Sequence, residues 1–375
     1  MSDLKKFFIY TAFEAAAMIV AVLVPIYLYL GLTIEQALQV VLVYKLTMAI
    51  AEVPTGVVGD RYGHKVSVLI GIFIMSLVLL GWLLLHGFIP MLVLAVIFGI
   101  GLTFQSGSNL ALLHSLSNDY KRDLAKHKYI SLTALMLSSI VAGFAFTLHP
   151  LLPVLITLIF KIISFIVLLT IHDPARNESE EHAKQRRIKE IMSGSVAILR
   201  TNKTVTAILT GLGLLVAVSM QFKYLTNTIF EVRGFSNMYI GIYYTLLVAS
   251  QIIGSLLSKN IHIKWHTLWM ILIFLLALAA FVPFKISLGI FLIIIMLIQV
   301  VEIDLKTDLL RLAGKNQRAT LLSTASLFTN LTYSIMLLMM GYFAGRNALN
   351  MYLVILVVLN IVLVLYNYVV AAREK

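Results

Sequence analysis

The sequence has 375 residues, of which 60% are hydrophobic and only 12% are charged. Soluble domains do not have this composition, so we expect a polytopic membrane protein. The formal net charge is +12 at pH 7, and the lack of cysteine excludes disulfides and thiol chemistry.

Twelve apolar runs of roughly twenty residues follow one another along the chain. Runs of this length are typical of helices that cross a bilayer, and the period-two alternation of a transmembrane barrel is missing. We therefore expect an all-α membrane protein with twelve transmembrane helices. The runs fall at about 7–30, 35–58, 66–86, 88–114, 129–148, 153–171, 203–226, 238–258, 267–283, 286–308, 320–342 and 349–371.

Lysine and arginine concentrate in every second loop when the N-terminus, with Lys5 and Lys6, is placed inside. Loops with this bias face the cytoplasm, so both termini are expected on the cytoplasmic side of the membrane. The excess positive charge then serves membrane topology and contact with anionic headgroups, and nucleic acid is not an expected partner.

The longest polar stretch, 172–202, divides the helices into six and six. We expect a six-helix bundle at 1–171, a cytoplasmic linker containing an amphipathic helix, and a second six-helix bundle at 203–375. The linker is either a solvated connector or a regulatory segment. Aligning 254–264 with 56–66 places glycine on glycine and base on base, which indicates an internal repeat.

The segment GVVGDRYGHK at 56–65 is similar to the signature between helices 2 and 3 of the major facilitator superfamily. The match rests on five residues, while His64 stands where a base is usual. Four further segments resemble the bacterial, exporter-like branch of this superfamily, which contains drug and proton antiporters. They are EVPTG, FQSGSNLALLHSL, Asp173-Pro174 and GFSNMYIGI. The resemblance implies two pseudo-symmetric bundles and secondary transport. The five matched residues are Gly56, Asp60, Arg61, Gly63 and Lys65.

Elementary physics gives four of these residues a role. We expect Gly56 to let helices approach closely and Gly63 to permit a tight reversal of the chain. Arg61 and Lys65 are expected to anchor the cytoplasmic side.

The resemblance implies that Asp60 faces the start of the eleventh helix near Thr320, where attraction to the helix dipole latches an inside-closed state. Glu52 is interpreted as a further gate residue. The alternative is a topology-setting turn with no gating role.

Ionisable groups inside a membrane are functional candidates because burying them is unfavourable. In the resembled fold, helices 1, 4, 7 and 10 line the central cavity, which favours Glu14 and Glu302. Either carboxylate would have a raised affinity for protons in a dry site. For Glu14 the alternative is a structural pairing with a polar neighbour such as Lys45, and for Glu302 it is a gate salt bridge with Lys306.

Two lysines also lie within the apolar runs. Lys45 is interpreted as an anion-binding charge or as a counter-ion that tunes Glu14 and Glu52. Lys161, on a helix that is peripheral in the resembled fold, is expected to snorkel or to pair.

Several polar residues are further candidates for proton coupling or substrate binding. A largely aromatic wall with few polar contacts would suit amphipathic organic substrates. The candidates are Gln105 and Asn109 on the fourth helix, Gln221 and Tyr224 on the seventh, and Gln299 on the tenth.

Enzymatic functions find little support, because the chain has no phosphate-binding loop, no His-rich cluster and no large soluble loop. We expect no metal and no cofactor. The fifth helix lacks the proline common in drug and proton antiporters, which weakens the case for antiport.

The expected function is secondary active transport by alternating access, with proton-coupled export of small amphipathic organic molecules as in multidrug efflux. The alternatives are a proton-independent facilitator, a lipid-like flippase or a non-transporting membrane sensor. Expected partners are the substrate, protons and the bilayer, with the protein as a monomer.

Overall fold

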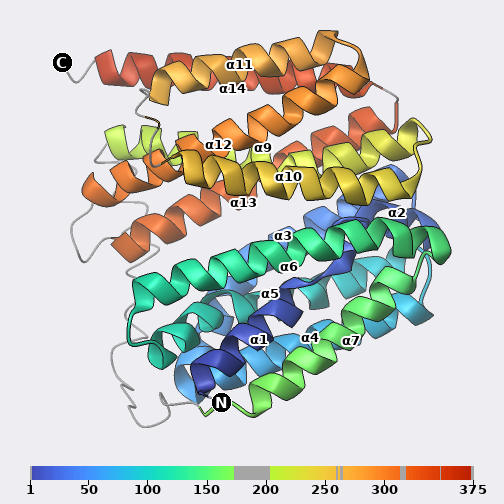
Figure 1. Ribbon diagram of the computed structural model, residues 1–375. Coiled ribbons are helices and arrows are strands. Elements are labelled where there is room, and N and C mark those ends of the chain that lie inside the picture. Colours follow the sequence, from blue (N-terminus) through green and yellow to red (C-terminus); the bar gives the residue numbers. More distant parts are fainter. Residues whose placement is uncertain are drawn as a thin grey trace. The chain divides into compact units, whose positions relative to one another are not determined.

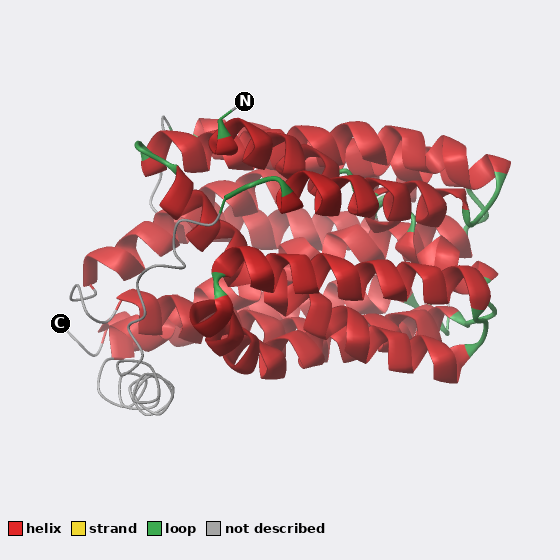
Figure 2. Cartoon of the chain, turned by 90° about the horizontal axis from the view of Figure 1, so that it is seen from below, coloured by secondary structure: helices red, strands yellow, loops and turns green. Residues whose placement is uncertain are grey.

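The computed structural model describes residues 2–172, 203–258, 261, 265–312, 318–346 and 348–372. Within these residues every regular element is a helix and no strand occurs (Figures 1 and 2). The prediction of an all-α membrane protein is confirmed.

Helices occupy all twelve predicted ranges. The first range holds α1 (Asp3–Ala15), the short 3-10 helix η1 (Met18–Val20) and α2 (Leu23–Tyr29). The others are α3 (Ile34–Tyr62), α4 (His64–Leu84), α5 (Phe88–Leu116), α6 (Tyr120–Leu148), α7 (Leu152–Leu169), α9 (Lys203–Val232), α10 (Asn237–Leu257), α11 (Trp265–Phe281), α12 (Phe284–Leu312), α13 (Arg318–Ala344) and α14 (Leu349–Ala372).

Among the described residues, eight helices are long and apolar enough to cross a membrane. The number rises to nine if the bent segment formed by Asp3–Val20 and Leu23–Tyr29 is one span. The described apolar parts of α11 and α14, Trp269–Phe281 and Leu349–Val362, are shorter than a full crossing. Twelve crossings therefore remain a prediction.

The first predicted helix is not continuous, and this corrects the expectation of one helix over 7–30. α1 ends at Ala15, and the two parts of the segment meet at an angle of 53°. Pro25 lies in the first turn of α2, where its missing N–H is tolerated, whereas deeper inside a helix its ring would clash with the preceding turn. No neighbouring residue explains the earlier break at Ala16 and Ala17.

The chain forms two compact units. One comprises Met1–Lys184 and Phe230–Val248, and the other comprises Gln185–Ile229 and Ala249–Lys375. Phe230–Val248 thus packs with the N-terminal helices, although the sequence places it in the C-terminal bundle. The contact is close at α6 and α10, since a Cβ atom on Gly143 would lie 2.8 Å from the Met238 carbonyl oxygen.

A similar packing pattern recurs in the two sets of helices. In the first unit α4 packs against α5 and α7, and in the second α11 packs against α12 and α14. These are the third, fourth and sixth helices of each proposed bundle, so the recurrence supports the proposed internal repeat.

Glycine allows α4 and α5 to approach closely. A Cβ atom on Gly71 would lie 2.7 Å from the Gly101 carbonyl oxygen and 2.6 Å from Gln105 Cγ. Small residues at such positions are common where membrane helices pack.

We expect Gly71→Ala to destabilise the protein by about 1–3 kcal/mol, because the added methyl group overlaps backbone that cannot easily move. Thermal unfolding in detergent measures the effect. Gly107→Ala on α5 is the matched control, since a Cβ atom there meets nothing within 4 Å. Equal melting temperatures for the two variants would contradict the packing argument.

Candidate functional site

The first helix, α1, carries a polar group of side chains in an otherwise apolar segment. Tyr10 and Thr11 are buried, and Glu14 follows one turn later, just before the break. Each of the three contacts a polar residue on another helix of the first unit.

Glu14 lies in a buried ion pair. Lys161 Nζ on α7 donates to Glu14 Oε1, and Ser164 Oγ donates to Glu14 Oε2 at 3.0 Å. The Glu14 side chain is 12% exposed and that of Lys161 is 4% exposed. With its amide oriented to satisfy its neighbours, Gln105 on α5 donates to Glu14 Oε1 at 2.7 Å and accepts from the Ile72 N–H at 3.2 Å. These four side chains, Glu14, Gln105, Lys161 and Ser164, form the Glu14 cluster.

The partner of Glu14 is therefore Lys161 rather than Lys45. Lys161 lies eight residues before the end of α7, roughly 12 Å along the helix, and Glu14 is at a similar depth from the same side. Lys45 lies much farther along α3 from its end at Tyr62, and its Nζ stands 5.3 Å from the Tyr44 ring centroid. Lys161 pairs inside the unit and does not snorkel.

Two more contacts extend from α1. Tyr10 OH donates to Asn109 Oδ1 at 2.7 Å, and Asn109 lies one turn after Gln105 on α5. Thr11 Oγ1 lies 3.1 Å from His127 Nδ1 on α6. Three of the predicted site residues, Glu14, Gln105 and Asn109, thus take part in hydrogen bonds between α1 and α5.

The motif loop contains the predicted tight reversal. Gly63 has φ +98° and ends α3 where α4 begins, a backbone conformation that L side chains rarely adopt. The expected close approach does not occur at Gly56, because a Cβ atom there would meet nothing within 4 Å. It occurs at Gly59, where a Cβ atom would lie 2.6 Å from Ser108 Oγ. Gly59, three residues later on α3, packs against α5.

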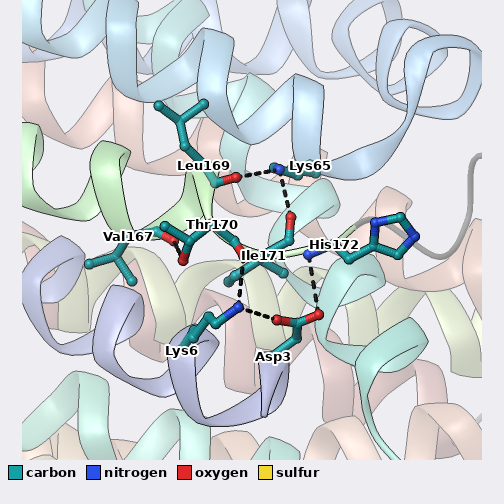
Figure 3. A network of polar contacts seen from close by, with 8 residues as sticks. All are labelled: Asp3, Lys6, Lys65, Val167, Leu169, Thr170, Ile171 and His172. Atoms are coloured by element: carbon teal, nitrogen blue, oxygen red, sulfur yellow. Dashed lines mark hydrogen bonds and ion pairs between the residues drawn. The ribbon is translucent and has the colours of Figure 1, made fainter. Parts of the chain in front are cut away.

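Lys65 of the motif binds the end of α7 (Figure 3). Its Nζ donates to the carbonyl oxygens of Leu169 at 2.8 Å and Ile171 at 2.6 Å. Carbonyl groups at a helix C-terminus lack intrahelical partners, and a cation there also suits the helix dipole.

Residues near the N-terminus bind the same end of α7 (Figure 3). Lys6 Nζ donates to the Thr170 carbonyl oxygen at 2.8 Å and to Asp3 Oδ1 at 2.6 Å, while His172 N donates to Asp3 Oδ2 at 3.3 Å. The helix that carries Lys161 is thereby fixed to α1 and to the motif loop.

We expect Lys65→Gln to loosen the end of α7 and raise amide hydrogen exchange over 166–172, because the cation that binds two carbonyl groups is lost. Arg61→Gln is the matched control, since the Arg61 guanidinium lies 5.4 Å from the Tyr62 ring centroid on the exposed surface. Equal exchange in the wild type and Lys65→Gln would contradict the assignment.

The remaining gate residues are only partly described. Glu52 is exposed on α3. The side chains of Asp60 and Thr320 lie outside the described part of the chain, so the latch stays a prediction.

The second unit holds its own ion pair. Lys306 Nζ donates to Glu302 Oε1 at 2.5 Å, one turn apart on α12, with side chains 45% and 15% exposed. Lys223 on α9 interacts electrostatically with Glu302. Gln299 lies on α12 beside Gly254 of α10, where a built Cβ atom would stand 3.0 Å from Gln299 Cβ.

Helix α9 carries the other predicted polar residues. Gln221 Nε2 donates to the Tyr333 carbonyl oxygen on α13 at 3.4 Å. The ring centroids of Tyr224 and Tyr333 are 6.3 Å apart. Both α9 residues thus face α13 within the second unit.

Residues 7–302 match the family model of the Major Facilitator Superfamily. The chain belongs to the Major Facilitator Superfamily.

Solved structures similar to this superfamily member include the nucleoside transporter NupG, with TM-score 0.77, 14% identity and coverage of 99% of each chain. A bacterial homologue of the human lysosomal transporter Spinster gives TM-score 0.75 and 16% identity, covering 99% of this chain and 96% of that one. A POT family transporter in complex with a thioalcohol-conjugated peptide gives TM-score 0.72 and 15% identity, again covering 99% and 96%. Identities this low show the fold alone, and no curated protein sequence matches. Membership of this superfamily indicates a transporter rather than an enzyme.

The prediction from sequence gave too little weight to Lys161. It did not include Ser164, Asn227 or Thr228 as candidates. Asn227 Nδ2 and Thr228 Oγ1 are buried on α9 and have no hydrogen-bond partner among the described residues, as is true of Gln221 Oε1. The polar run Thr226, Asn227, Thr228 inside an apolar helix was the available signal.

In the described part of the chain, no three His, Asp or Glu side chains lie close enough together to bind a metal ion. The chain's one pair of histidines four residues apart is His262 and His266, and His262 and the side chain of His266 lie outside that part.

Proposed function

We propose that this superfamily member is a secondary active transporter that works by alternating access and exports small amphipathic organic molecules in exchange for protons. The observation that carries the proposal is the buried Glu14 cluster. A carboxylate held by one cation and two neutral donors has two stable forms, one paired with Lys161 and one protonated.

Proton coupling follows from competition at Glu14. A proton that binds Glu14 neutralises it and leaves the Lys161 ammonium without its counter-charge in a buried site. An unpaired buried charge is unfavourable, so the ammonium favours a different arrangement of α1 and α7, or entry of an anion or water. The membrane potential can drive this step, since one charge moved across 100 mV is worth about 2.3 kcal/mol.

The substrate side of the proposal rests on α9. Its buried groups on Gln221, Asn227 and Thr228, which have no hydrogen-bond partner among the described residues, offer both donors and acceptors. Aromatic rings lie close by, with Phe222 and Phe291 centroids 4.8 Å apart. A site that combines buried polar groups with aromatic rings suits an amphipathic molecule. The neighbours named for nucleoside and peptide transport support a small organic substrate.

Gating in this proposal uses the motif loop and the Glu302–Lys306 pair. Asp60 would latch against the start of α13, and Lys65 would keep α7 fixed to the loop while the latch opens. The bundles 1–171 and 203–375 would rock about the linker. The setting we propose is a monomer in the bacterial inner membrane with both termini in the cytoplasm.

The test uses purified protein in proteoliposomes with an imposed pH gradient and a panel of lipophilic cations, neutral drugs, organic anions and nucleosides. We expect at least one compound to dissipate the gradient only when the protein is present. Flux of a compound without proton movement would instead identify a facilitator or flippase, and binding without flux would identify a sensor. Either result overturns proton-coupled export.

A further inference from the structure

The first two turns of α6 present a strongly basic surface. Lys121, Arg122, Lys126 and Lys128 are all exposed, and none forms an ion pair with a described residue. Lys126 Nζ lies 4.5 Å from the ring centroid of Phe8 on α1. We call the exposed face of Lys121, Arg122, Lys126, Lys128 and Tyr129 the α6 basic face.

The acids of this segment are engaged elsewhere. Asp123 accepts a hydrogen bond from Ser117 Oγ at 2.5 Å, and Asp119 accepts from the Arg122 N–H at 3.2 Å as the helix cap. Leu124 and Ile130, on the opposite side of the helix, pack against the core cluster of the first unit. The four exposed bases outnumber these two acids, so the surface has a net positive charge.

The basic face continues into an apolar stripe. Arg122, Lys126 and Tyr129 follow helical spacing, and the same spacing leads to Leu137, Ile140 and Phe144. These four uncharged side chains are exposed, at 66% for Tyr129, 56% for Leu137, 37% for Ile140 and 44% for Phe144. A tyrosine between bases and exposed apolar residues is typical of the level where headgroups meet hydrocarbon.

We propose that the α6 basic face and this stripe bind an anionic phospholipid. The phosphate of the headgroup contacts Arg122 and Lys126, Lys121 and Lys128 add positive charge beside it, and the acyl chains lie along Leu137, Ile140 and Phe144. Clusters of bases beside a membrane helix attract anionic lipids. A general topological bias would require bases somewhere in this loop, but it would not require Arg122 and Lys126 to share one helix face with the lipid-exposed stripe. The site is on the side of the unit where α1 begins, and it is independent of the proposed transport function.

The test is native mass spectrometry of the full chain in a mild detergent, titrated with phosphatidylglycerol or phosphatidylcholine. We expect wild type to retain phosphatidylglycerol in preference to phosphatidylcholine. Combined K121Q, R122Q, K126Q and K128Q substitutions should raise the dissociation constant for phosphatidylglycerol at least tenfold. Combined K121R, K126R and K128R substitutions keep the charge and should keep the affinity, which separates loss of charge from misfolding.

The matched control removes two exposed bases elsewhere, with Lys285→Gln and Arg346→Gln, and should leave affinity unchanged. Equal loss in the control, or no preference for the anionic lipid, would overturn the site. Glycerol phosphate without acyl chains is the third arm. If it competes as well as the lipid, the face binds a free anion and the proposal of a lipid site is wrong.

Discussion

Replacing Lys161 with methionine is expected to destabilise the protein by about 3–5 kcal/mol, because the buried Glu14 would lose its counter-ion and would have to stay charged unpaired or take up a proton. Ser164 and Gln105 would still donate to the carboxylate, but neutral donors do not replace a full charge in a buried site. Reversible unfolding in mixed detergent micelles would measure the change.

A double-mutant cycle separates the ion pair from packing. The variant with both Glu14→Gln and Lys161→Met should recover most of the lost stability, because no unpaired charge remains. Lys285→Met on the exposed first turn of α12 should change stability by less than about 0.5 kcal/mol. If Lys161→Met is as mild as Lys285→Met, the buried pair does not exist as described.

The second large effect is expected from Glu14→Gln. Glutamine keeps the shape of the side chain and one of the two acceptor oxygens, but it cannot bind and release a proton near neutral pH. We expect accumulation driven by a pH gradient to fall at least 100-fold. Exchange of labelled for unlabelled substrate at equal pH should persist within a few-fold, because it does not require net proton movement. Transport assays in proteoliposomes measure both rates for each variant.

Glu302→Gln is the matched control for this prediction. Glu302 is also paired with a lysine, but Lys306 is 45% exposed and lies one turn away on the same helix. We expect Glu302→Gln to retain gradient-driven accumulation within about tenfold. The reverse pattern, with coupling lost in Glu302→Gln and retained in Glu14→Gln, would assign the coupling role to Glu302.

The helix positions were predictable from sequence because hydrophobic length is nearly sufficient to define a membrane helix. The break near Ala16 was not predictable, since three consecutive alanines favour a continuous helix and only Pro25 marks the region. The glycine-centred reversal at Gly63 could be predicted, because only the left-handed backbone region allows so short a turn.

The partner of Glu14 was missed because sequence gives the depth of a residue in the membrane but not the direction in which it points. Lys161 was undervalued through an assumption about peripheral helices, although its depth matched that of Glu14. Lys65 was expected to face the membrane surface as an anchor. Its contact with the end of α7 depends on packing between α4 and α7, which no local pattern encodes.

The most direct test of the central claim measures proton release on substrate binding in weakly buffered detergent solution, using a compound that dissipates the pH gradient. We expect substrate binding to the wild type to release protons, up to about one per bound molecule, and binding to Glu14→Gln to release none. Equal release from both proteins, or none from the wild type across the pH range of binding, would contradict coupling through Glu14.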